Sequence, residues 1–187
     1  MKIEISQKEN LIYRLLFALA IIVVAAALRI APHPWNFTPI GAMALFSGAL
    51  VGDRRLAFAF PLLTLFFGDL FLGFYKSGLM LVVYASFLLS VLIGRWVENH
   101  RSLARISGAT LLGSIQFFLI TNFGVWALGS SYPHSLPGLT ACYARGVPFF
   151  WNTLAGDTFY VTVFFGGFAL AEHFVPVLRE PARASIQ

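Results

Sequence analysis

Six runs of apolar residues, separated by short polar or proline-rich stretches, constrain the possible folds of this chain most strongly. The runs cover residues 11–31, 38–52, 55–75, 77–97, 107–129 and 148–175. A helix needs about 20 apolar residues to cross the hydrocarbon core of a bilayer. A transmembrane β-barrel would instead alternate polar and apolar residues in stretches of about ten. The pattern therefore predicts an all-α integral membrane bundle of six transmembrane helices, of which the second is short.

The composition agrees with a chain surrounded by lipid. Of the 187 residues, 58% are hydrophobic and 11% are charged, whereas soluble domains have about 25% charged residues. A soluble domain of this size could not hide so much apolar surface. We therefore expect one transmembrane domain over residues 11–175, between a cytoplasmic N-terminal segment, 1–10, and a cytoplasmic C-terminal tail, 176–187.

The basic residues predict how the chain lies in the membrane. When the connections are assigned alternately to the two sides, ten Lys and Arg fall on one side and three on the other. Positive charge marks the cytoplasmic side, so both termini are predicted there. Because the basic residues are scattered singly and form no common face, we expect no nucleic-acid partner.

The first apolar run also has features of a signal peptide, with a cleavage site at Ala25-x-Ala27. Glu4 and Glu9 dilute its basic region, and the run is longer than secretion needs. We therefore favour a transmembrane helix at this position.

Two ionisable side chains, Asp69 and Asp157, lie well inside the predicted spans. A carboxylate in hydrocarbon is costly unless it is paired or neutralised, so each indicates a functional site by default. Both follow a glycine, and their spans are antiparallel, which fits the remnant of an inverted repeat. The structural alternative is that each carboxylate is paired with a helix end or with a basic residue such as Arg145, Lys76 or Arg29.

Other polar and aromatic residues share helix faces with these positions. Thr153, Asp157 and Tyr160 form one polar stripe of the sixth span at helical spacing. Asn122 and Trp126 lie one turn apart in the fifth span. The arrangement predicts an outward-facing pocket between the third, fifth and sixth spans.

A long loop over residues 130–147 is predicted to cover this pocket, because loops of this length are usually functional or disordered and this one is rich in aromatic residues. The expected substrate-binding residues are Asp157, Asn152, Trp151, Asn122, Trp126, Tyr143, Arg145 and Asp69. Two other interpretations stay open. The aromatic residues also fit a belt at the membrane interface, and Asn122 and Gln116 also fit hydrogen bonds between helices.

The sequence has few features of catalysis or metal binding. His33 and His134 have no closely spaced His, Cys or carboxylate partner, so we interpret them as interfacial polar groups. Cys142 is interpreted as a small inert residue. The chain has no glycine-rich phosphate loop, zinc-protease motif or nucleophile elbow. We therefore expect neither an enzyme nor a bound cofactor or metal.

Several segments resemble a family of small bacterial membrane proteins known only as a domain of unknown function. These segments are Asn36–Ala42, Gly52–Arg55, Tyr132–His134 and the stretch from Cys142 to Thr153. That resemblance covers most of the chain and implies no activity.

The chain also distantly resembles the substrate-binding S components of energy-coupling-factor vitamin transporters. The resemblance is carried by six short spans, by substantial outer loops, and by Leu28-Arg29, Pro39-Ile40-Gly41 and Phe67-Gly68-Asp69-Leu70. It implies that the bundle binds a small vitamin-like solute near its outer face. It also implies a separate transmembrane coupling subunit and paired ATPases as partners. The docking pattern Ala-x-x-x-Ala occurs at Ala27 and Ala31, at the outer end of the first span rather than in its central turns.

Three functions therefore stay open. The first is a solute uptake protein of the S-component type. The second is an ion- or proton-coupled secondary transporter in which Asp69 and Asp157 are the coupling carboxylates. The third is a non-catalytic subunit of a membrane complex, which would bind its partner through faces of small residues such as Ala44, Gly48 and Gly52.

Overall fold

The computed structural model describes residues 12, 16, 19–20, 23–25, 27–29 and 32–174. All of the described residues between 12 and 29 are helical. Five continuous helices follow: α2 (Ile40–Leu50), α3 (Arg54–Leu72), α4 (Ser77–Val97), α5 (Leu103–Leu128) and α6 (Leu136–Phe174). No strand occurs in the described residues, so the prediction of an all-α chain is confirmed for this part.

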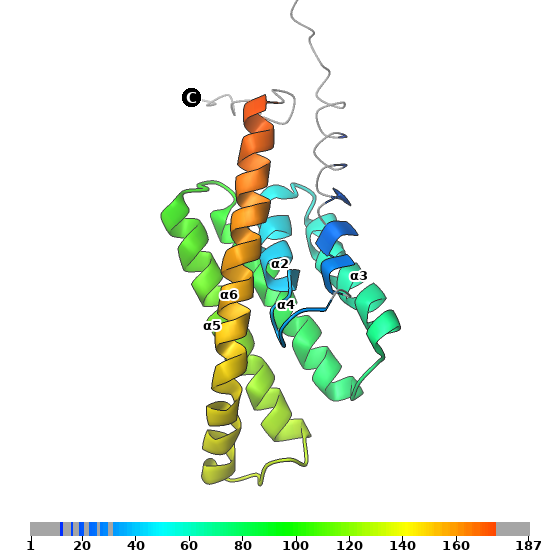
Figure 1. The fold of residues 1–187 in the computed structure, drawn as a ribbon, viewed down its shortest axis with the longest axis vertical. Coiled ribbons are helices and arrows are strands. Elements are labelled where there is room, and N and C mark those ends of the chain that lie inside the picture. The colour runs from blue at the N-terminus through cyan, green and yellow to red at the C-terminus, as the bar shows by residue number, and fades with distance from the viewer. Residues whose placement is uncertain are drawn as a thin grey trace, which may run out of the picture.

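Helices α3 to α6 are each long and apolar enough to cross a membrane. They run in alternating directions along the long axis of the molecule (Figure 1). Large apolar side chains cover their outer surfaces, and Phe71, Leu81 and Leu103 are 75%, 71% and 82% exposed. Apolar surface is stable in lipid but unfavourable in water. These features indicate a membrane protein.

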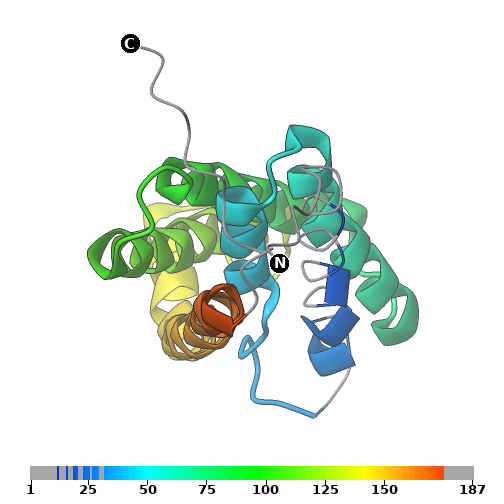
Figure 2. The ribbon, with the colours of Figure 1, turned by 90° about the horizontal axis from the view of Figure 1, so that it is seen from above.

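Helix α2 is the central element, enclosed by α3, α4, α5 and α6 (Figures 1 and 2). Every residue from Ile40 to Ala49 is buried. Its 11 residues give a length of about 16 Å, roughly half of a hydrocarbon core of about 30 Å. Six complete spans are therefore not confirmed, because α2 is too short to cross the membrane alone.

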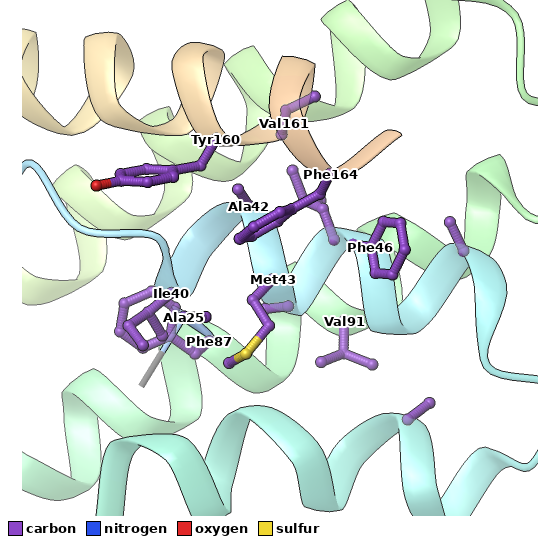
Figure 3. Close-up of a cluster of buried hydrophobic side chains, with 14 of the residues drawn as sticks. Ala25, Ile40, Ala42, Met43, Phe46, Phe87, Val91, Tyr160, Val161 and Phe164 are labelled. Atoms are coloured by element: carbon purple, nitrogen blue, oxygen red, sulfur yellow. The ribbon is translucent and has the colours of Figure 1, made fainter. Parts of the chain in front are cut away.

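Aromatic and branched side chains pack on two sides of α2 (Figure 3). Helix α6 contributes Tyr160 and Phe164 on one side, and α4 contributes Phe87 and Val91 on the other. The ring of Phe46 meets that of Phe164 edge to face, with centroids 6.0 Å apart. In lipid, the hydrophobic effect does not drive helices together, so packing contacts such as this one hold the core.

Glycines let the backbones of α2 and α4 touch. A Cβ atom at Gly48 would collide with the carbonyl oxygen of Val91. A Cβ atom at Gly94 would collide in the same way with the carbonyl oxygen of Leu45. Gly48 and Gly94 therefore allow α2 and α4 to approach as closely as small residues permit helices to pack in lipid.

Polar residues set the ends of the long helices. Asp53 caps α3 by accepting hydrogen bonds from the backbone N–H groups of Arg55 and Leu56, at 2.8 and 3.0 Å. Gly73, with a φ of 96°, ends α3, in a conformation that residues with a side chain rarely adopt. Ser102 caps α5. These signals explain why the expected and observed ends of these elements lie close together.

The prediction of a long loop over residues 130–147 is wrong. Helix α6 begins at Leu136, so only residues 129–135 connect it to α5. Ser135 holds the first turn, because its side chain accepts from the N–H of Gly138 and its carbonyl oxygen accepts from the N–H of Leu139. Pro148 is accommodated inside the helix. At 39 residues, α6 is about 58 Å long and extends well beyond a hydrocarbon core of about 30 Å.

The two ends of the bundle differ in their connections. The α2–α3 and α4–α5 connections lie at one end, and the α3–α4 and α5–α6 connections lie at the other (Figure 1). Which end faces the cytoplasm stays a prediction. The predicted segments 1–10 and 176–187 lie outside the described residues, as does much of the predicted span 11–31, so the signal-peptide alternative is also untested.

Candidate functional site

A polar cavity of about 200 Å³ lies inside the bundle beside the first turn of α2, and we call it the Asp157 cavity. Val83, Phe87 and Phe117 form apolar parts of its wall. Its polar lining comes from three helices and two connections, and consists of Arg29, Asn36, Thr38, Tyr75, Ser90, Thr153 and Asp157. Hydrogen-bonding groups are thus collected around one space between helices whose outer surfaces are apolar, with Asn36 and Tyr75 at its exposed side.

Asp157 lies on α6 and is 5% exposed. The hydroxyl group of Ser114 donates to its Oδ2 atom at 2.7 Å, and the backbone N–H of Ala42 is a further donor. Helix α2 has no acidic residue in its own first turn, and its N-terminus carries a partial positive charge. The carboxylate of Asp157 therefore caps α2 from a neighbouring helix.

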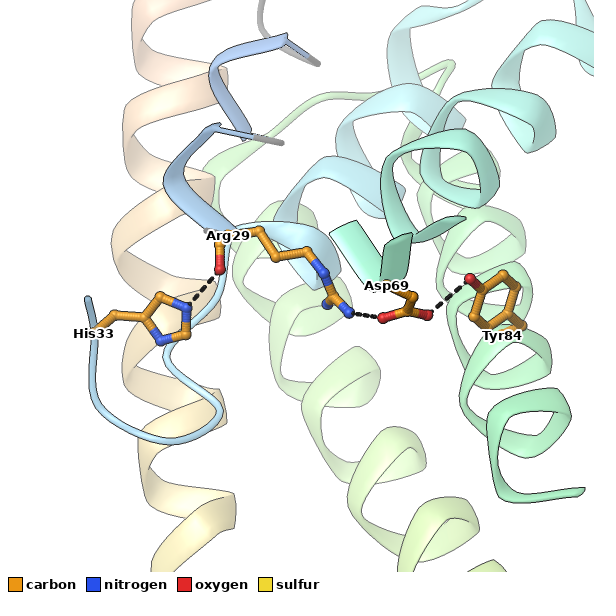
Figure 4. A network of polar contacts seen from close by, with 4 residues as sticks. All are labelled: Arg29, His33, Asp69 and Tyr84. Atoms are coloured by element: carbon orange, nitrogen blue, oxygen red, sulfur yellow. Dashed lines mark hydrogen bonds and ion pairs between the residues drawn. The ribbon is translucent and has the colours of Figure 1, made fainter. Parts of the chain in front are cut away.

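Asp69 has different partners (Figure 4). Arg29 donates from its Nη2 atom to Oδ1 of Asp69 at 2.5 Å, and the Tyr84 hydroxyl donates to Oδ2 at 2.8 Å. Asp69 is 1% exposed, so this ion pair is buried. A ring nitrogen of His33 lies 3.1 Å from the carbonyl oxygen of Arg29. Of the pairings left open by the sequence, the structure therefore contains the one between Arg29 and Asp69.

Arg29 also forms part of the wall of the Asp157 cavity. Its guanidinium group passes so close to Gly68 that a Cβ atom there would collide with it. The buried Nε atom of Arg29 has no hydrogen-bond partner among the described residues. Nearby, burial raises the pKa of Tyr75 to about 12, with the negative charge of Asp69 adding to the rise and Arg29 opposing it. Tyr75 thus stays a neutral hydroxyl group at neutral pH.

A second cavity of about 320 Å³ adjoins the first, and we call it the Arg145 cavity. The guanidinium group of Arg145 lies 5.9 Å from the ring centroid of Tyr132, within reach of a cation–π contact. Asn122 donates to the carbonyl oxygen of Phe118 at 2.8 Å, and the Cys142 thiol lies 3.4 Å from the carbonyl oxygen of Asn122. The two cavities share the lining residues Asn36, Val83 and Phe117.

Two aromatic residues predicted at the pocket are tied to the backbone beside it. The hydroxyl group of Tyr143 donates to the carbonyl oxygen of Leu119 at 2.7 Å. The indole N–H of Trp126 donates to the carbonyl oxygen of Pro133 at 2.9 Å. Neither side chain lines the Asp157 cavity or the Arg145 cavity. Both connect α5 to the segment around the start of α6.

Trp151 and Asn152 also lie away from the two cavities. Trp151 is 60% exposed on the outer surface of α6. Asn152 donates to the carbonyl oxygen of Trp35 at 3.0 Å and so holds the 32–39 turn against α6. Of the eight predicted site residues, the structure brings Asp157, Asn122 and Arg145 to the cavity walls and places Asp69 behind Arg29.

Sequence reasoning did not select several residues that line the Asp157 cavity: Arg29, Asn36, Thr38, Tyr75 and Ser90. The prolines around Asn36 indicated a turn, and Asn36 has a φ of 62°. No sequence signal places that turn beside α6, where a Cβ atom at Gly156 would lie 3.1 Å from the Cα atom of Phe37. These residues become neighbours only through the tertiary fold.

The arrangement is suited to binding. The Asp157 cavity offers a carboxylate, hydroxyl groups and a guanidinium group around one small space. Among the described residues, no three His, Cys, Asp or Glu side chains gather in a way that would hold a metal ion.

Comparisons with known proteins add one finding. Neither the curated proteins nor the solved structures contain a match to this chain. A family model described as a family of unknown function, DUF6580, matches residues 9–178. Since this match covers most of the 187 residues, the chain belongs to that family.

Proposed function

We propose that this chain is a membrane transport protein that binds a small vitamin-like solute in the Asp157 and Arg145 cavities. One observation supports this most strongly. Among the described residues, Asp69 and Asp157 are the buried carboxylates, and Asp157 is the one that lines a polar cavity. Buried polar groups in a membrane protein are costly and commonly line the pathway of a solute or ion. The proposal explains why these groups gather around an open space instead of being replaced by apolar residues.

The sizes and positions of the cavities support a solute larger than an inorganic ion. The Asp157 cavity has about 200 Å³ and the adjoining Arg145 cavity about 320 Å³. Taken together, they fall within the range of about 300–1,000 Å³ that small-molecule sites commonly enclose. Tyr75 and Tyr132 come from the α3–α4 and α5–α6 connections. The solute would therefore enter from the end of the bundle that carries these connections, which is the predicted outer side.

An uptake protein of the S-component type is the form of transport that we propose. The chain has no phosphate-binding loop of its own, so coupling to ATP would need a transmembrane subunit and paired ATPases as partners. The proposed location is the bacterial inner membrane.

A ligand screen tests the proposal. The purified chain is heated with each member of a panel of vitamins, and its unfolding temperature is recorded. Ligand at a hundredfold excess over Kd stabilises a protein by about 2.7 kcal/mol, which such a measurement detects. The expected result is stabilisation by one class of solute and loss of that effect in Asp157→Asn. A panel without any stabilising solute would contradict the proposal.

A second candidate is a proton-coupled secondary transporter, and one observation favours it. Among the described residues, Asp157 forms no ion pair, unlike Asp69. Of the two carboxylates considered for coupling, Asp157 is therefore the better candidate. In liposomes, this function requires solute flux driven by a pH gradient and abolished by Asp157→Asn. Flux without any response to the gradient would exclude it.

A further inference from the structure

The charge balance around Asp157 is incomplete. Its carboxylate is buried and receives neutral donors, the Ser114 hydroxyl and the Ala42 N–H. Within the part of the chain that the structure describes, no Lys, Arg or His forms an ion pair with it. The N-terminus of α2 adds the equivalent of about half a positive charge. About half of the negative charge of an ionised carboxylate is therefore left without compensation.

The other charged and titratable groups near the cavity do not supply the missing charge. Arg29 lies in the wall, but it forms an ion pair with Asp69, which also accepts from Tyr84. Tyr75 is a neutral hydroxyl group at neutral pH, because its pKa is about 12. Tyr160, one turn along α6 from Asp157, is uncharged. The Arg29–Asp69 pair is neutral as a unit, so the cavity as a whole carries the charge of Asp157.

The apolar walls suit a compact organic group. Phe87 and Phe117 line the cavity with ring centroids 4.8 Å apart. Aromatic faces attract cations within about 6 Å. The cavity volume of about 200 Å³ equals the space of about six or seven waters in the liquid, at about 30 Å³ each.

We infer that the Asp157 cavity binds the positively charged end of an organic solute, either a protonated amine or a cationic nitrogen heterocycle. The inference rests on the proposed function, because it names the chemistry of the solute in that site. The positive group lies against the carboxylate of Asp157 and balances the part of its negative charge that the N-terminus of α2 does not compensate. The walls formed by Phe87 and Phe117 hold the apolar part of the same group.

Three fragments of nearly equal size test this inference: benzylammonium, benzyl alcohol and benzoate. Their binding to the purified chain in lipid nanodiscs is measured by calorimetry. We expect benzylammonium to bind about tenfold more tightly than benzyl alcohol, as for a buried hydrogen bond to a charged group. Benzoate is expected not to bind. In Asp157→Asn, the preference for benzylammonium over benzyl alcohol should disappear.

Two further variants complete the design. Thr162→Val changes an exposed position of the same helix, and it serves as the control for partition of the fragments into lipid. This variant should keep the preference for benzylammonium over benzyl alcohol. Ser114→Ala keeps the carboxylate and removes one donor to it, so benzylammonium should bind more tightly than to the unchanged chain. This second variant tests the inference even where Asp157→Asn fails to fold.

The outcomes separate the inference from the proposed function. Equal binding of amine and alcohol, preferred binding of benzoate, or a preference that survives in Asp157→Asn would overturn the inference. Absence of benzylammonium binding would also overturn the inference. That result is expected where a proton alone neutralises Asp157. A neutral vitamin found in the screen, with which benzylammonium does not compete, would leave the proposed function standing and remove the inference alone. Cation binding without any vitamin ligand or flux would leave the inference standing and contradict the proposed function.

Discussion

The carboxylate of Asp157 in α6 lies against Gly41 in the first turn of α2, and a Cβ atom at residue 41 would collide with it. This contact joins the longest helix of the bundle to the short central helix. It also places the N-terminus of α2 at the edge of the Asp157 cavity. Asp157 therefore has two roles in this account, because it caps α2 and forms part of the proposed solute site.

Gly41→Ala tests the closeness of this contact. The added methyl group must displace the buried carboxylate, and we expect the free energy of unfolding to fall by about 1–3 kcal/mol, as for other overpacked sites. Gly166→Ala is the matched control, because a Cβ atom at this helical position meets no other atom within 4 Å. Thermal unfolding of both variants in the same detergent measures the difference. Equal stability of the two variants would show that residue 41 is not crowded.

Asp69→Asn tests the buried ion pair. The change leaves the charge of Arg29 without a partner inside the bundle, so we expect a loss of about 3–5 kcal/mol in the free energy of unfolding. The pair between Arg95 and Glu98, at 3.1 Å and with side chains 24% and 26% exposed, provides a more accessible control. Glu98→Gln should cost less than about 1 kcal/mol, since surface pairs contribute little. Similar losses in the two variants would contradict a buried pair.

Gly94→Ala tests the contact between the backbones of α2 and α4. The new methyl group would meet the carbonyl oxygen of Leu45, which belongs to a buried helix and cannot rotate away. We expect the free energy of unfolding to fall by about 3 kcal/mol, at the upper end of the usual range for overpacking. Gly167→Ala, at an open position of α6, should be nearly neutral. Denaturant titrations of the two variants provide the comparison.

Cysteine labelling tests the arrangement of the connections. The change Cys142→Ser removes the buried Cys142 and gives a chain without cysteine. Single exposed positions of that chain are then replaced by cysteine. An impermeant maleimide should label Ser131→Cys in intact cells and Gly52→Cys only after lysis. Labelling of both from one side would contradict the alternating helix directions. Labelling in the reverse order would contradict the predicted cytoplasmic location of the termini.

The sequence predicted the elements of this fold better than their contacts. The bounds of α4 agree with the predicted run 77–97, because polar residues interrupt the apolar sequence on both sides. The start of α6 was misplaced, because residues 136–147 carry polar and aromatic side chains without the apolar run that marks a span. A helix that continues beyond the bilayer has no hydropathy signal, so hydropathy alone could not find its first three turns.

The candidate site shows the same division. Asp69 and Asp157 were selected because each is an ionisable group within an apolar run. Their different partners could not be deduced from two nearly identical sequence contexts, because the Arg29 side chain and the start of α2 reach them only in the folded bundle. Trp151 was selected as an aromatic residue at the predicted outer end of the sixth span, although its side chain is 60% exposed on the outer surface of α6.

The most direct test of the account compares Thr153→Val with Thr162→Val. Both hydroxyl groups donate to the carbonyl oxygen four residues earlier in α6, at 2.9 and 2.8 Å, but only Thr153 lines the Asp157 cavity. The Kd of the solute found in the screen is measured for both variants. If the solute binds in the Asp157 cavity, Thr153→Val should weaken binding about fivefold, the value of one hydrogen bond, and Thr162→Val should leave it unchanged. Equal affinities of the two variants, or weaker binding only in Thr162→Val, would contradict the account.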